Sequence, residues 1–235
     1  MTPKTPSAEQ MLREMAAAYA GKIPEGYDLK ANIVVRDGDA ETRWHVLSEG
    51  GQLAHGPGLA DDAQTTLTMT GETLTRLYRG QWSGLGAAGR AHIRDAAPID
   101  FTIPQGLHPL EAMRRGYYFL THFFSASSPT LIPFGPEHTR KIHGGHAAPL
   151  FYDAGLRSSY YRLEPGDVLN EDGAKDPMHQ GFVVISGRGV ATIGERTLAI
   201  RAGQAVYIPA NTIHMLRPEG GEPVELIWLA WGAQA

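Results

Sequence analysis

The chain has 235 residues, a formal net charge of −4 from 21 basic and 25 acidic residues, and no cysteine. This length is sufficient for two domains of ordinary size, each with its own core. The balanced charge, with no run of Lys or Arg, argues against nucleic acid as a partner, and the lack of cysteine excludes disulfides, thiolate metal sites and a cysteine nucleophile.

No apolar run in the sequence approaches the roughly 18 residues that a membrane-spanning helix requires. Residues 1–10 lack the basic and apolar regions of a secretory signal. We therefore expect a soluble, cytoplasmic protein with no membrane span.

The N-terminal part of the chain begins with a helical pattern and continues with an extended one. Apolar residues at helical spacing predict a helix over residues 7–21, with Ser7 as the N-cap. Two extended runs follow at 32–35 and 43–47, and the Asp37-Gly38 pair between them predicts a hairpin.

The pattern then alternates between strand and helix. Residues 65–70 alternate apolar side chains with threonine, as in a half-buried strand. Residues 71–80 change to the helical period and end at a glycine, which predicts a short helix. A glycine-rich turn at 83–89 and a further strand at 90–94 are expected next.

Residues 108–124 are predicted to form a longer helix. Met113, Tyr117, Leu120 and Phe124 recur at spacings of four, three and four. The aromatic residues of this segment cover more than one side of a helix. Two interpretations follow: part of the helix lines a cavity, or the helix packs between two domains.

The order of these elements over residues 7–125 resembles the sterol-carrier-protein type 2 family. The resemblance implies an α+β domain, with helices on one side of a sheet, that binds sterols, acyl chains or other lipids in an apolar tunnel. The matching features are the strand around Trp44, the Gly50-Gly51 turn, the strand 65–70, the helix 73–80 with its Leu-Tyr-Arg-Gly ending, and the segment 89–94.

The second half of the chain has the pattern of an all-β domain. Residues 125–136 contain three prolines and three serines, which is typical of a connector. Many short extended runs follow, without a convincing helix, and they predict a β-sandwich or jelly-roll barrel. The predicted strands cover residues 150–152, 158–163, 181–185, 190–193, 197–200, 205–208, 213–216 and 224–231.

A motif in this half resembles the second sequence motif of the cupins. Gly203, Pro209 and His214 have the spacing of that motif, and Asn211 replaces its second glycine. Asparagine tolerates the left-handed backbone conformation, so we expect the turn to be kept. The resemblance implies a cupin jelly-roll barrel, and we predict a lipid-binding domain at 1–125, a linker at 126–137 and a cupin domain at 138–235.

Metal-binding cupins carry paired histidines and a glutamate in their first motif, and this chain lacks the paired histidines. The resemblance leaves His179, near the position of the family glutamate, and His214 as ligands, with Gln180 at or beside that position. Asp176 best matches the lost second histidine, while Glu171 and Asp172 are alternatives. Two imidazoles and a carboxylate suit a transition metal such as Fe, Zn, Mn, Ni or Cu. Strand alternation leaves open whether residue 179 or 180 faces inward.

His143 and His146 are a second candidate pair, because a glycine loop would let them reach the mouth of a barrel. No nucleophile elbow is present, and the run 84–89 is expected to lead into a strand, which argues against a phosphate-binding loop. The remaining histidines are interpreted as surface or packing residues: His45, His55, His92, His108, His122 and His138.

Two functions are compatible with these patterns. The first is a metal-dependent cupin enzyme, of oxygenase, isomerase or lyase type, that acts on a small apolar molecule bound or delivered by the lipid-binding-type domain. The second is a non-catalytic lipid or small-molecule binding or sensing protein with a metal-free pocket. A homodimer paired through exposed strand edges is expected in either case.

Overall fold

A computed structural model describes residues 5–91, 95–102, 104–153 and 155–232. The chain divides into two compact units, the first made of Met1–Ala88 and Ala96–Pro133 and the second of Gly89–Asp95 and Phe134–Ala235. The segment 89–95 thus belongs to the second unit although it lies within the predicted first domain. Residues 92–94 of the predicted strand 90–94 lie outside the described residues.

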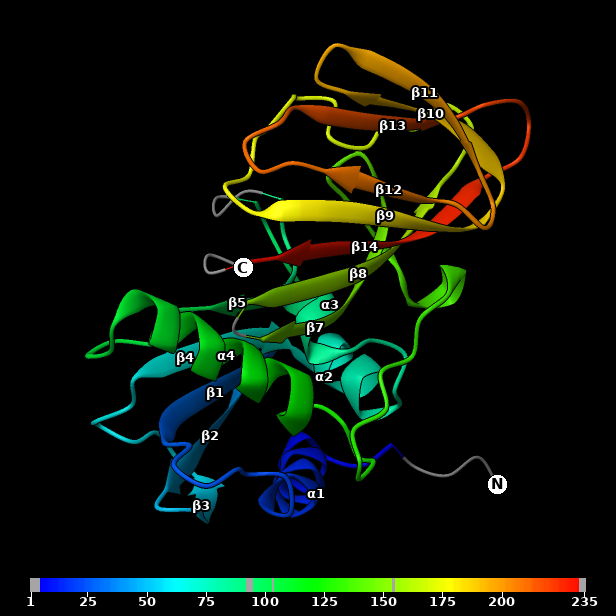
Figure 1. Ribbon diagram of the computed structural model, residues 1–235. Helices are drawn as coiled ribbons and strands as arrows, with labels where there is room; N and C mark the ends of the chain where they lie inside the picture. The colour runs from blue at the N-terminus through cyan, green and yellow to red at the C-terminus, as the bar shows by residue number, and fades with distance from the viewer. Residues whose placement is uncertain (1–4, 92–94, 103, 154, 233–235) are drawn as a thin grey trace. The chain divides into compact units, whose positions relative to one another are not determined.

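The first unit contains a five-stranded sheet with the order β3-β2-β1-β4-β5 (Figure 1). Strands β1 and β4 are parallel, and the other neighbours are antiparallel. The predicted hairpin is confirmed, since Asp37 pairs with Ala40 across the turn. The strands are β1 Leu29–Asp37, β2 Ala40–Glu49, β3 Gln52–Pro57, β4 Thr65–Thr70 and β5 Ile99–Phe101.

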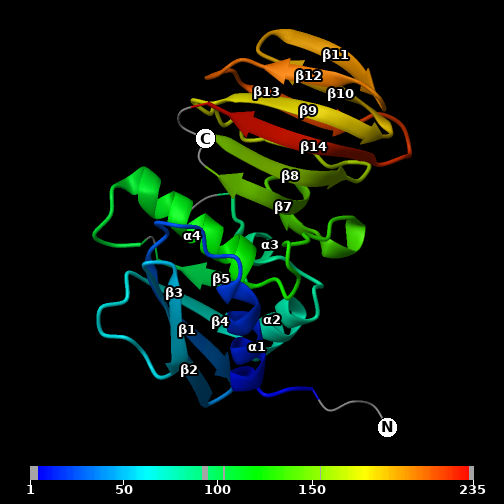
Figure 2. The ribbon, with the colours of Figure 1, turned by 60° about the horizontal axis from the view of Figure 1, so that its bottom comes forward.

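Four helices accompany this sheet: α1 Ala8–Ala20, α2 Gly71–Tyr78, α3 Gly84–Ala88 and α4 Pro109–Phe123 (Figure 2). The N-cap of α1 is Ser7 as predicted, and its hydroxyl oxygen accepts a hydrogen bond from Gln10 N at 3.2 Å. Helix α1 packs on β2 and β3, and α2 packs on β1 and β4. They cover the sheet face that carries Ile33, Trp44 and Leu67, each 2% exposed or less.

Helix α3 corrects the prediction that residues 83–89 form a turn leading into a strand. Ser83 Oγ accepts a hydrogen bond from Gly86 N at 2.9 Å and so caps the helix. A Cβ at Gly84 would lie 2.1 Å from the backbone oxygen of Leu120 in α4. The small residues of this run therefore allow close helix packing, which composition alone does not distinguish from a turn.

Three phenylalanines at the C-terminal end of α4 pack into the core of the first unit. Tyr19 of α1 lies with its ring centroid 5.6 Å from those of both Phe119 and Phe123, in edge contacts. Phe119, Phe123 and Phe124 are at most 3% exposed. These three side chains thus serve packing within the unit.

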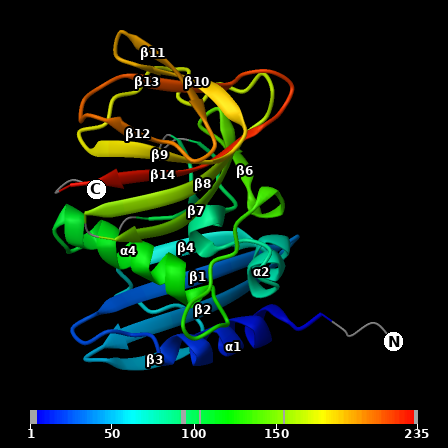
Figure 3. The same ribbon diagram turned by 45° about the vertical axis from the view of Figure 1, so that its right-hand side comes forward.

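The second unit is built of two sheets. The larger has the order β12-β9-β14-β8-β7-β6, and the smaller has the order β11-β10-β13; Figure 3 shows them as two layers. The strands are β6 Arg140–Ile142, β7 Gly145–Asp153, β8 Leu156–Leu163, β9 His179–Ser186, β10 Arg188–Ile193, β11 Arg196–Arg201, β12 Ala205–Ile208, β13 His214–Pro218 and β14 Val224–Trp231, and a short 3-10 helix η1 Pro136–His138 precedes them.

Each strand predicted in this half overlaps a strand of the structure. The prediction of a closed barrel is corrected, because the two sheets do not close on each other over the ranges described above. Among the described residues, the hydrogen-bonded ladders end at β12 and β6 in one sheet and at β11 and β13 in the other. Strand β12 is short and is followed by Pro209, whose backbone has no N–H to extend a ladder. The second unit nevertheless has an apolar core, which includes Phe182, Leu216 and Leu226.

No helix in the described parts of the chain combines the length and the apolar character needed to cross a membrane.

Candidate functional site

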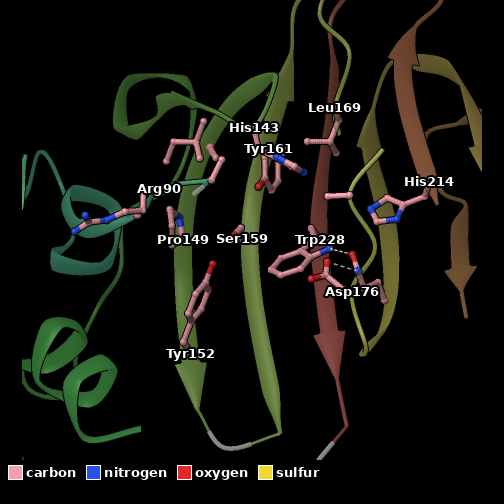
Figure 4. Close-up of a pocket in the computed structure, with 16 residues that line it drawn as sticks. Arg90, His143, Pro149, Tyr152, Ser159, Tyr161, Leu169, Asp176, His214 and Trp228 are labelled. Carbon is pink, nitrogen blue, oxygen red and sulfur yellow. Dashed lines mark hydrogen bonds between the residues drawn. The ribbon is translucent and has the colours of Figure 1, made fainter. Parts of the chain in front are cut away.

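A cavity of about 210 Å³ lies within the second unit. Its walls come from the inward faces of β7, β8, β9 and β14, from the start of β13, and from loops at each end (Figure 4). Polar and aromatic side chains alternate with small apolar ones around it. The polar and aromatic lining residues are Arg90, His143, Tyr152, Ser159, Tyr161, Asp176, Gln180, His214 and Trp228.

The turn before β13 aims His214 at this cavity. Asn211 has a φ of 59°, the left-handed conformation expected from its place in the motif. Its backbone N–H donates to the carbonyl oxygen of Asp176 at 2.6 Å, which ties the turn to the loop before β9. His214 is 4% exposed, and its ring meets Phe182 edge-on with centroids 5.8 Å apart. The imidazole of His214 therefore lies inside the second unit, at the wall of the cavity.

Burial lowers the pKa of His214 below its ordinary value. The Thr212 carbonyl and the Asp176 carboxylate act in the opposite direction, and His143 lowers the pKa further. His214 Nδ1 lies 3.3 Å from the carbonyl oxygen of Thr212, which can only accept. The neutral ring thus carries its proton on Nδ1 and keeps a lone pair on Nε2.

Two hydrogen bonds fix the orientation of Gln180. Trp228 Nε1 donates to Gln180 Oε1 at 2.7 Å, and Gln180 Nε2 donates to Asp176 Oδ2 at 2.6 Å. Because an indole N–H only donates, the amide oxygen faces Trp228 and the amide nitrogen faces Asp176. Gln180 is 2% exposed, so both bonds form in a buried environment.

His179 lies on the opposite face of β9, away from the cavity. Adjacent strand residues point to opposite faces, so an inward Gln180 forces His179 outward. There the His179 ring stacks on Tyr207 and Trp231, and its Nδ1 lies 2.7 Å from the Tyr207 hydroxyl. The structure therefore brings Asp176 and His214 together at the cavity but separates His179 from them.

The second candidate pair also divides between two faces. His143 lines the cavity from the turn between β6 and β7, where its φ is 55°. His146 belongs to β7, where the inward positions are those of Ala147 and Pro149. Gly144 brings this turn within reach of the next loop, since a Cβ there would lie 2.0 Å from the carbonyl oxygen of Val168.

The remaining histidines differ in their surroundings. His55 stacks on Trp44 with centroids 5.8 Å apart, and His122 Nδ1 lies 2.8 Å from the Thr130 hydroxyl. His92 lies outside the described residues.

The residues at the cavity do not fit a three-ligand transition-metal site. His143, Asp176 and His214 are the lining residues whose side chains are common metal ligands. In the described ranges, no group of three or more His, Asp and Glu side chains is arranged to hold a metal ion. Glu171 and Asp172, the alternative ligands, are exposed in the loop before β9.

Several lining residues were not identified from the sequence. Trp228, Tyr161 and Tyr152 face the cavity from β14, β8 and β7. An aromatic residue at an inward strand position is equally typical of a core, so its type gives no sign of a cavity. For Gln180 a signal existed, because the resemblance to cupins implied that it lies at or beside the position of the family glutamate.

These features can be compared with known proteins. Residues 159–230 match the family model described as Cupin domain. The matched segment contains Ser159, Asp176, Gln180, His214 and Trp228 and thus much of the cavity wall. The cupin family includes both metal-dependent enzymes and non-catalytic members. A search of curated proteins found no match.

Several solved structures resemble part of this chain. A Cupin 2 conserved barrel domain protein from Salinispora arenicola is 19% identical, with 44% of this chain and 89% of that chain covered and a TM-score of 0.40. A protein of the same description from Rhodopseudomonas palustris is 20% identical over 38% and 61% of the chains, with a TM-score of 0.35. A predicted oxalate decarboxylase from Thermotoga maritima is 16% identical over 37% and 79%, with a TM-score of 0.34.

Proposed function

We propose that the cupin region is a small-molecule-binding domain whose ligand occupies the cavity beside His214 and Asp176. One observation carries the proposal: a cavity of about 210 Å³ to which a buried neutral imidazole and a carboxylate both contribute. An engineered cavity of roughly 150 Å³ holds benzene, so this volume suits a ligand of about one ring with a short substituent.

A cavity-filling variant tests the proposal. Ala147 lines the cavity and is 2% exposed, so Ala147→Leu would occupy space that a ligand needs. Ala199, exposed in β11, provides the control Ala199→Leu. Saturation-transfer NMR with a set of single-ring fragments should show binding to the unchanged protein and the control, and lost binding to Ala147→Leu. Equal binding to all three would exclude the cavity as the binding site.

A metal-dependent enzyme is the second candidate, since Asp176 and His214 are two of the three ligands predicted for it. Substrates of the oxygenase, isomerase or lyase classes would enter the same cavity. Elemental analysis of protein purified without a metal-affinity tag tests this function. About one transition metal per chain, lost in His214→Ala, would support the enzyme over the metal-free binding domain.

For the first unit we retain lipid binding of the sterol-carrier type as a proposal. A cavity of about 230 Å³ supports it, because Leu77, Phe124 and Ile132 give its wall an apolar part that suits an acyl chain. The wall also has a polar part, which includes Arg79 and Ser125. Displacement of a fluorescent fatty acid by unlabelled fatty acid tests lipid binding. If the protein does not bind the probe, lipid binding is refuted, and the aromatic residues of α4 serve only to pack the helix.

Pairing of two chains through the second unit is also a proposal. Val183 and Ile185 of β9 and Tyr207 of the edge strand β12 are between 42% and 56% exposed. Apolar exposure beside a sheet edge supports a homodimer. Light scattering should give twice the chain mass, and Ile185→Lys should reduce it to one chain. A single-chain mass for the unchanged protein would refute the pairing.

A further inference from the structure

The Asp176 carboxylate is half-buried at the wall of the cavity. Its hydrogen-bond donor is the neutral amide of Gln180. In the part of the chain that the structure describes, no Lys or Arg forms an ion pair with Asp176. His214 is 4% exposed, and its Nδ1 lies 3.3 Å from the carbonyl oxygen of Thr212. Burying a charge is costly unless a partner compensates it, so a ligand that supplies the opposite charge would gain binding energy here.

Two groups at the cavity offer hydrogen-bond acceptors to a ligand. The donor-only indole of Trp228 fixes the Gln180 amide, which in turn holds one oxygen of Asp176 and leaves the other lone pairs of the carboxylate for a ligand. His214 Nε2 is a further acceptor, because its ring proton lies on Nδ1 beside the Thr212 carbonyl. A ligand that carries several N–H donors is complementary to both groups.

Aromatic rings complete this environment. Trp228, Tyr161 and Tyr152 line the cavity, and Figure 4 shows the Trp228 indole next to Asp176. The negative face of an aromatic ring attracts cations, most strongly in tryptophan. Arg90 also lines the cavity, but Figure 4 shows its guanidinium pointing away from Asp176 and Trp228. Its charge therefore does not occupy the space beside the carboxylate.

We propose that the cavity selects a small protonated amine, about the size of one ring with an aminomethyl group. The ammonium lies between Asp176 and the Trp228 ring, and the apolar part of the ligand contacts the tyrosines. This inference rests on the proposed binding function, which it makes specific by assigning a ligand class and by giving Gln180 the role of a positioning residue.

Three probes with the same ring test the charge preference: benzylamine, benzyl alcohol and benzoate. Isothermal titration calorimetry at pH 7 on the full chain should give the tightest binding for benzylamine, about tenfold tighter than for benzyl alcohol, as expected from a desolvated cation next to a carboxylate and an aromatic face. Benzoate should bind weakest, because Asp176 repels it. This comparison uses the unchanged protein and does not depend on the folding of a variant.

Asp176→Asn keeps an oxygen that accepts from Gln180 but removes the charge. It should reduce the preference for benzylamine over benzyl alcohol to about twofold or less while benzyl alcohol still binds. Glu171→Gln, at an exposed position of the same loop, is the matched control and should keep the preference. Benzyl alcohol or benzoate binding as tightly as benzylamine would overturn the amine assignment alone. Absence of binding by all three probes would overturn the proposed function as well.

Discussion

Gln180→Glu tests the hydrogen-bonded chain that joins Trp228 to Asp176. The variant conserves size and still offers Trp228 an oxygen acceptor, but it replaces the amide donor that lies 2.6 Å from Asp176 Oδ2. Once ionised, the new carboxylate would face a second carboxylate. Two like charges near 4 Å repel by about 4 kcal/mol at an effective dielectric constant of 20, and since Asp176 is only half-buried we expect about 2–4 kcal/mol of lost stability.

The loss should depend on pH in a defined direction. Repulsion raises the pKa of the introduced carboxyl in the folded state above its unfolded value of about 4.3. The folded state then holds a proton that the unfolded state releases, so stability present below that value is lost progressively as the pH rises. A protonated carboxyl still donates to Asp176, so near pH 4 the variant should approach the unchanged protein.

Differential scanning calorimetry between pH 4 and pH 8 measures this effect. At pH 8 the transition of the second unit should fall by on the order of 10 °C, and the difference should shrink toward pH 4. Gln204→Glu is the control, because Gln204 is exposed and its Oε1 already accepts from Arg201 N. A loss of stability that is the same at every pH would refute the assignment of the amide orientation.

Three further variants test other contacts. Burial lowers the pKa of His214 below its ordinary value of 6.5, so the stability that the neutral ring contributes is present above pH 6.5 and is lost as the pH falls below it. His214→Asn should therefore lose less stability than the unchanged protein between pH 7 and pH 5, as measured by urea unfolding. Gly144→Ala should lower the free energy of unfolding by at least about 3 kcal/mol in the same assay, because φ is +82° and the new Cβ would meet a carbonyl oxygen. Gly166→Ala is the control: φ is also positive but no atom lies near the new Cβ, so the loss should be about 1–2 kcal/mol. Trp228→Phe leaves Gln180 Oε1 without its donor and should cost about 1–3 kcal/mol; a cost near zero would contradict the importance of that bond.

The sequence predicted strands β7 to β14 of the second unit, because turn residues separate them clearly, but it did not predict β6 or η1. The motif from Gly203 to His214 also predicted a specific backbone detail, the left-handed Asn211. Closure of the barrel was not predictable in this way. Whether two strand edges meet depends on strand length and twist, and no residue type reports these quantities.

The inward side chain of β9 could not be chosen from the sequence because both faces of the strand are apolar. Val183 and Ile185 lie on the outer face and are exposed, while Phe182 and Val184 lie in the core. Alternation requires that one of each adjacent pair points inward but does not say which. In this structure Gln180 points inward, so His179, one of the three predicted metal ligands, lies outside the cavity.

The orientation of one amide links the two candidate chemistries of this cavity. The resemblance to cupins predicts Gln180 at or beside the position of the family glutamate, and in the structure the bond from Trp228 turns the NH₂ group of Gln180 toward Asp176. The carboxylate of Asp176 and the neutral imidazole of His214 match a single positive charge with N–H donors better than a divalent ion that needs several strong ligands. His143 also lines the cavity, but no group of three metal-ligating side chains is found among the described residues. If that reasoning holds, Gln180→Glu should also gain binding of Ni²⁺ at pH 7.5 by calorimetry, with proton release, because it adds the third ligand beside Asp176 and His214. If Gln180→Glu binds Ni²⁺ no better than the Gln204→Glu control, the Gln180 amide does not determine whether the cavity binds an amine or a metal ion.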